Sequence, residues 1–185
     1  MISTLIKTLT ASNSASLEFV DGTSDVVLDD TYDEYMFVWY DINPNDDDVN
    51  FTFQVNATDD AGGGYDTSVF TTSYFAVEHT EAASADSFNA GGHDMSQSNG
   101  RPTLANNIGN GGDESCAGIM NIYGISSSTY VKHFTVRSSI YGADSSMREV
   151  HVAGYINDTT PIDEFHFQVQ GGGNFDGVIQ LYGIA

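Results

Sequence analysis

The chain has 185 residues, of which 26 are acidic and only 5 are Lys or Arg, so its formal net charge is −21 at pH 7. Hydrophobic residues make up 40% of the sequence, which is enough for a core and excludes a wholly disordered chain. A surface this acidic repels phosphate backbones and anionic lipid headgroups, so we expect neither nucleic-acid nor membrane partners.

Short alternating segments rich in Val, Ile, Phe, Tyr and Thr predict β-strands along the whole chain, and helical periodicity is missing. Residues 2–10 alternate in this way, which indicates a strand and not a signal peptide. Residues 35–40 are apolar on both faces, as is typical of a strand covered on both sides or of a subunit contact. Ten strands are expected, near residues 2–10, 15–20, 35–42, 49–57, 68–78, 117–125, 130–139, 148–156, 163–170 and 176–184.

Two sequence patterns occur twice. FTFQV at 51–55 matches FHFQV at 165–169, and GIMNIYGIS at 118–126 matches GVIQLYGIA at 177–185. Each FxFQV segment follows an alternating strand and an Asx/Pro turn, so the same hairpin is expected twice. The repeats predict an all-β fold with two related halves in a single domain over 1–185, an antiparallel β-sandwich that is jelly-roll-like.

A polar segment over residues 79–115 separates the two halves and is predicted to be one long central loop. Its Ser, Asn, Gly and Asp content leaves three interpretations open: a disordered loop, an arm that grips a neighbouring subunit, or a ligand-binding loop.

Charge also differs between the halves. Residues 1–100 hold 18 carboxylates and one cation, whereas residues 101–185 hold 8 carboxylates and four cations. Either the acidic half is simply a solvated flank, or it faces outward while the other half meets a partner.

The sequence contains few patterns that indicate chemistry. No GxSxG motif is present, and the glycine runs lack a Walker lysine, so they are interpreted as turns between strands. The only cysteine, Cys116, can form neither an intrachain disulfide nor a paired-cysteine metal site. We therefore expect no enzyme activity, no cofactor and no structural metal. Asp41, Asp46, Asp47 and Asp48 are interpreted as part of a turn, with weak cation binding by their carboxylates as the alternative. His133, His151 and His166 are expected at the surface or between subunits, with a zinc site as the alternative.

Four segments resemble a group of small virion structural proteins of tailed phages, especially marine ones. They are IKTLTASNSASLEF at 6–19, GRPTLANNIGNGGDESCAGIMNIYGISSSTYVKHFTV at 100–136, VAGYINDTTPIDEFHFQV at 152–169 and DGVIQLYGIA at 176–185. The resemblance spans almost the whole chain but carries no catalytic motif. It implies a β-sandwich built into a virus particle that is assembled in the host cytoplasm.

Within that group, a capsid decoration (cement) protein is the expected function. Such a protein would bind the major capsid protein or another virion protein, as a homotrimer or another homo-oligomer, and stabilise the assembled head. Arg101, Arg137, Arg148 and Trp39 are the predicted partner contacts, with the core as the other place for Trp39. The alternative function is a tail-fibre or receptor-binding component that recognises a host surface glycan.

Overall fold

The protein is described by a computed structural model, which covers residues 2–59, 65, 68–82 and 86–185. Every strand pairing in it is antiparallel, and among these residues no helix is long and apolar enough to cross a membrane. The strands are β1 (Ser3–Ser14), β2 (Leu17–Val20), β3 (Glu34–Pro44), β4 (Val49–Ala57), β5 (Phe70–Thr80), β6 (Asp86–Ala90), β7 (Met95–Ser98), β8 (Thr103–Ile108), β9 (Cys116–Tyr123), β10 (Lys132–Gly142), β11 (Ser146–Ile156), β12 (Ile162–Val169) and β13 (Phe175–Ile184), with a 3-10 turn at Gln170–Gly172.

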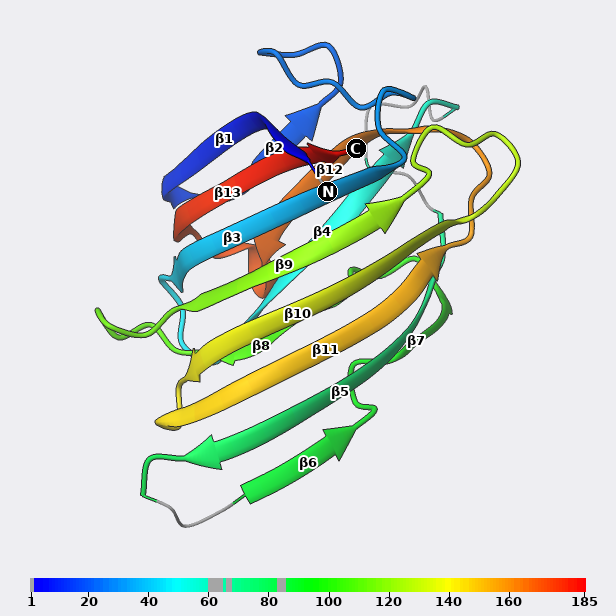
Figure 1. Ribbon diagram of the computed structural model, residues 1–185. Helices are drawn as coiled ribbons and strands as arrows, with labels where there is room; N and C mark the ends of the chain where they lie inside the picture. The colour runs from blue at the N-terminus through cyan, green and yellow to red at the C-terminus, as the bar shows by residue number, and fades with distance from the viewer. Residues whose placement is uncertain (1, 60–64, 66–67, 83–85) are drawn as a thin grey trace.

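The strands form two layers (Figure 1). The large sheet has the order β1-β13-β3-β9-β10-β11-β5-β6, and β7 pairs with the same edge of β5 as β6 does. The small sheet, with the order β8-β4-β12-β2, lies behind it in Figure 1. A single residue pair, Gly142 with Ile108, links the two sheets through β10 and β8. The predicted all-β, antiparallel, sandwich-like fold is confirmed.

Aromatic side chains fill the space between the sheets. Phe167 of β12 lies at the centre, with ring centroids 6.1 Å from Phe19, 5.1 Å from Phe37, 6.0 Å from Phe51 and 6.3 Å from Phe53. All five rings are fully buried, and they belong to one hydrophobic cluster. Alternation along β4 and β12 directs Phe51, Phe53 and Phe167 to one face, so the FxFQV pattern encodes much of the small sheet's contribution to the core.

The repeated FxFQV strands pair with each other. Phe53 of β4 lies opposite Phe167 of β12, and Phe51 lies opposite Val169. The strand before each repeat belongs to the large sheet, since β3 pairs with β13 and β9 while β11 pairs with β10 and β5. The prediction of two hairpins was therefore wrong. Each copy is an arch that crosses from the large sheet to the small sheet. Its second strand forms hydrogen bonds within the small sheet and packs its aromatic residues against the large sheet.

The second repeated pattern flanks β3 on both sides, as β9 and β13. Its first glycine makes room for a β3 side chain each time. A Cβ atom at Gly118 would lie 2.4 Å from the Trp39 ring, and one at Gly177, where φ is +142°, would lie 2.7 Å from Ile42. The repeated glycines thus allow large side chains of β3 to pack inside the sandwich.

All ten predicted strands are present, but the expected loop over 79–115 is not. This segment contains β6 and β7, which both pair with β5, and β8, which pairs with β4. The prediction of one long central loop was wrong because backbone pairing with existing edges orders a segment that has few apolar side chains. Residues 83–85 of this segment lie outside the described part of the chain.

Polar side chains are also buried in the sandwich, and Lys132 is one of them. The ammonium group of Lys132 is fully buried and donates hydrogen bonds to the carbonyl oxygens of Ser127 (2.8 Å), Asp158 (3.2 Å) and Thr160 (2.6 Å). Lys132 therefore ties together the loops that precede β10 and β12. The Cys116 thiol is also buried, and burial raises its pKa well above the usual range.

Candidate binding surface

The candidate site is the side of the large sheet that points away from the small sheet, and Figure 1 views the molecule from this side. We call it the outer face and define it by alternate residues of four neighbouring strands. They are Ala117, Ile119, Asn121 and Tyr123 of β9; His133, Thr135, Arg137, Ser139 and Tyr141 of β10; Met147, Glu149, His151, Ala153 and Tyr155 of β11; and Thr71, Ser73, Phe75, Val77 and His79 of β5.

The outer face carries almost no charge. Its only acidic or Lys/Arg side chains are Arg137 and Glu149, and they pair with each other at 2.6 Å between Nε and Oε1. His151 Nε2 also lies 3.1 Å from Glu149 Oε1. Hydrogen bonds from Arg137 and then His151 lower the pKa of Glu149 below its ordinary value. Four strands of a chain with net charge −21 thus present a surface on which the fixed charges cancel.

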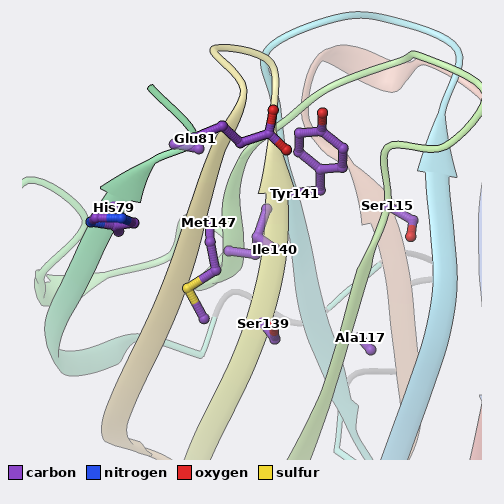
Figure 2. A pocket seen from close by; sticks show the side chains of 9 residues that line it. His79, Glu81, Ser115, Ala117, Ser139, Ile140, Tyr141 and Met147 are labelled. Carbon is purple, nitrogen blue, oxygen red and sulfur yellow. The ribbon is translucent and has the colours of Figure 1, made fainter. Parts of the chain in front are cut away.

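A hollow lies at one end of the outer face. It has a volume of about 460 Å³, and Figure 2 shows His79 and Met147 on one side of it and Ser115 and Ala117 on the other. Tyr141 closes the end, beside Glu81, whose negative charge raises the pKa of the Tyr141 hydroxyl. Small side chains at positions 117 and 139 leave the floor open.

The hollow continues along the sheet. A second depression of about 300 Å³ shares Ala117, Ser139 and Met147 with the first and extends to Arg137 and Glu149. A third, of about 420 Å³, lies over the other end of β10 and β11, between His133 and Tyr155, above Ala153. Small residues on either side of the Arg137–Glu149 pair therefore create shallow hollows along the outer face, which we together call the track.

Apolar side chains gather at the edge of the outer face nearest β6. Phe75, Val77, Phe88 and Met147 are 39%, 48%, 66% and 47% exposed. The Phe75 ring stacks on His151 with centroids 4.8 Å apart and contacts Phe88 with centroids 5.9 Å apart. Exposed apolar groups that lie together on a charge-poor surface are typical of a protein–protein contact.

The four predicted contact residues lie in different places. Arg137 is on the outer face, with 67% of its side chain exposed. Trp39 is 1% exposed, in the core position that was its alternative, and Arg148 is 6% exposed, so neither side chain is presented at the surface. Trp39 belongs to the core, and Arg148 is directed between the sheets, where it pairs with Glu78 (3.2 Å) and Asp144 (2.6 Å).

Arg101 lies on the outside of the small sheet, far from the outer face in the fold. Its Nη1 atom is 2.7 Å from Nδ1 of His166, and its guanidinium carbon is 5.6 Å from the centroid of the Tyr65 ring. Burial, reinforced by the Arg101 charge, lowers the pKa of His166 to about 4. The neutral imidazole accepts at Nδ1 and carries its proton on Nε2, which faces Glu18 at 3.6 Å. Arg101 is therefore engaged within the molecule and only half-exposed.

The four acidic residues of the predicted weak cation site do not form a chelating group. Asp41 lies in a bulge of β3 with φ +56°, while Asp46, Asp47 and Asp48 form the exposed turn before β4. Asp48 accepts a hydrogen bond from the Asn107 amide at 2.6 Å, and Asp47 accepts one from the Asn110 N–H at 3.3 Å. No group of three or more His, Cys, Asp or Glu residues in the described ranges could hold a metal ion.

The sequence did not single out the small residues that shape the track, such as Ala117, Ser139 and Ala153. The alternation along each strand does indicate that they face outward, since each is next in sequence to a buried residue, whose side chain points to the other face of the sheet. The charge difference between the halves was a second signal, because β9, β10 and β11 all belong to the less acidic half.

No protein-family model matches the chain, and no curated protein and no solved structure matches it either.

Proposed function

We propose that this protein is a virion structural component, a capsid decoration protein that binds the assembled phage head through its outer face. The observation that carries the proposal is that the residues that define this face hold one ion pair, Arg137 with Glu149, and no other acidic or Lys/Arg side chain, on a chain with net charge −21. A protein this acidic repels other copies of itself and other acidic surfaces, so a close protein contact requires a region without excess charge.

The side chains of the outer face suit such a contact. The exposed apolar group of Phe75, Val77, Phe88 and Met147 supplies area whose burial is favourable, at roughly 25 cal/mol per Å². The shallow track beside it gives the surface relief that a matching ridge of a partner protein can fill. Arg137 and Glu149 already neutralise each other, so binding a partner removes no unbalanced charge from water at this position. The pair can still add specificity to the contact.

The function requires binding alone. A protein that binds the assembled shell more tightly than its separated subunits stabilises the shell by the difference in binding free energy. We propose that the partner is the major capsid protein or another virion protein, that copies cluster as a homotrimer or another homo-oligomer, and that the protein resides in the virion after assembly in the host cytoplasm.

The test is to quantify this polypeptide against the major shell protein in purified particles by mass spectrometry. A decoration protein is expected in many copies, on the order of tens or more per particle, at sites set by shell symmetry. A few copies per particle, together with inhibition of adsorption by the purified protein, would instead support the receptor-binding alternative. Absence from particles would overturn both assignments.

A further inference from the structure

A cavity of about 250 Å³ lies on the opposite side of the large sheet from the outer face, beside β5 and β6. Tyr74, Ala76 and Glu78 of β5 and Arg148 of β11 point into the space between the sheets here. The remaining walls are Asn106 of β8, the end of β6 with Asn89 and Ala90, and the turn that joins β6 to β7, with Gly91, Gly92 and His93.

Three polar atoms in the walls of this cavity lack a hydrogen-bond partner among the described residues: Nη1 of Arg148, the hydroxyl of Tyr74 and Oδ1 of Asn106. Arg148 and Tyr74 are only 6% and 3% exposed. A buried polar atom without a partner costs free energy, so the three atoms leave hydrogen-bonding capacity unmet in the walls of one cavity.

Neighbouring contacts fix the roles of these atoms. The Arg148 guanidinium donates from Nε to Glu78 and from Nη2 to Asp144, which leaves Nη1 as a donor without a partner. The Asn107 amide nitrogen donates to the carboxylate of Asp48 at 2.6 Å, so Asn107 Oδ1 must accept. It accepts from Asn106 Nδ2 at 2.8 Å, and this leaves Asn106 Oδ1 as an acceptor.

The charge of the cavity disfavours an ionic ligand. Glu78 and Asp144 carry two negative charges against the single positive charge of Arg148, so an anion would add to an excess of negative charge. A cation would face the unpaired N–H of Arg148. His93 adds no charge at neutral pH, because burial lowers its pKa below the ordinary value.

The turn over the cavity is anchored to Tyr74. Gly91 N donates to the Tyr74 carbonyl at 3.1 Å, Tyr74 N donates to Asp94 at 2.5 Å, and the His93 ring meets the Tyr74 ring edge-to-face at 4.9 Å. Gly91 and Gly92 both have φ near +80°, at +83° and +81°. The turn is therefore held in place by the same residue whose hydroxyl lacks a hydrogen-bond partner.

We infer that this cavity binds a small neutral polyhydroxylated compound, either a free polyol or monosaccharide or the terminal sugar unit of a glycan. Each hydroxyl of such a compound both donates and accepts, so one molecule satisfies the donor of Arg148, the acceptor of Asn106 and the hydroxyl of Tyr74 together. The inference concerns a different side of the molecule from the proposed capsid contact and stands or falls separately from it.

The test is titration of the ¹⁵N-labelled full-length protein with glycerol, D-glucose, D-galactose and lactose, and with sodium acetate as the anionic comparison, followed by amide chemical shifts. At least one neutral compound is expected to give saturable shifts at Tyr74, Gly91, Gly92 and Asn106, and acetate none there. Binding of monosaccharides but not lactose identifies free compounds as ligands, and equal binding of lactose identifies a glycan terminus. No saturable shifts with any neutral probe, or tighter binding of acetate, would overturn the inference.

Tyr74→Phe removes only the unpartnered hydroxyl, so the fold is expected to persist while affinity for the bound probe falls by about 3- to 10-fold. Asn106→Ala should weaken binding by a similar factor. Tyr130→Phe is the matched control, because Tyr130 is 74% exposed and does not line the cavity. Unchanged affinity in both Tyr74→Phe and Asn106→Ala would show that the probe binds elsewhere, which also overturns the inference.

Discussion

Trp39 of β3 lies directly opposite Gly118 of β9, and its indole ring occupies the space that a side chain at position 118 would need. A Cβ atom at position 118 would lie 2.4 Å from the ring and 2.7 Å from the carbonyl oxygen of Arg137. Neither neighbour can move freely, since the ring is buried and the carbonyl belongs to the adjoining strand. This glycine therefore fixes where the only tryptophan packs.

Gly118→Ala is accordingly expected to lower the free energy of unfolding by about 2–3 kcal/mol, as overpacking of a core usually does. Urea unfolding followed by Trp39 fluorescence measures the change. Gly112→Ala is the control, because a Cβ there meets nothing within 4 Å, and its expected effect is within about 0.5 kcal/mol. Equal stability of the two variants would contradict the packing described.

Lys132→Met keeps the length of the side chain but removes the donor to three carbonyl oxygens. We expect a loss of about 3 kcal/mol, because the carbonyls of Ser127, Asp158 and Thr160 lose a charged partner. For a domain of this size the melting temperature should fall by roughly 6–12 °C, measured by circular dichroism. Lys7→Met, which removes one contact to the Ser24 carbonyl, should cost less than about 1 kcal/mol. A smaller loss of stability in Lys132→Met than in Lys7→Met would contradict the role of Lys132 in holding the three carbonyl groups.

The lowered pKa of His166 predicts a pH-dependent stability. The pKa is about 4 in the folded protein against 6.5 for an unperturbed imidazole, so between these values the unfolded chain binds a proton that the folded chain does not. This contribution to stability is complete above pH 6.5 and is lost as the pH falls towards 4, by about 3 kcal/mol in all.

NMR titration of the imidazole should find a midpoint near pH 4, and a midpoint near 6.5 would contradict the burial of the ring. In His166→Asn the stability should fall less steeply over the same pH window than in the unmodified protein. Parallel profiles would mean that other groups account for the acid sensitivity.

A negative charge on the outer face should abolish the proposed capsid contact. Ala153 is exposed on that face and lines the track, so Ala153→Glu adds charge without disturbing the core. We expect its co-sedimentation with purified particles to weaken at least about 10-fold relative to the unmodified protein. Ala15→Glu, in the exposed turn between β1 and β2, makes the same chemical change away from the face and should bind normally. Normal binding by both variants would exclude the outer face as the contact.

Alternation of apolar residues was sufficient to predict ten strands, because each of them buries one face in the sandwich. It was not sufficient for β6, β7 and β8. The first two pair with β5 near the edge of the large sheet, and exposed or half-exposed residues such as Ser87, Asn89 and Gln97 leave little apolar pattern to detect. β6 and β7 are ordered by backbone hydrogen bonds to β5, a strand that lies outside their own sequence segments.

The same alternation also indicates whether a charged side chain points into the core or towards solvent. Arg148 has the parity of Val150 and Val152, and Lys132 has that of Phe134, so both point inward. Charge alone favoured a surface position for Arg148, and only the paired carboxylates of Glu78 and Asp144 make its burial tolerable. Those partners come from other positions in the fold and could not be inferred from one strand.

Because the lone thiol of Cys116 is enclosed between the sheets, maleimide and iodoacetamide reagents have nothing to react with on the native protein. A cysteine introduced at an exposed position such as Ala15 would therefore be modified alone, without first removing the natural one. One fluorophore or heavy-atom tag per polypeptide would then allow individual copies to be counted and located by microscopy.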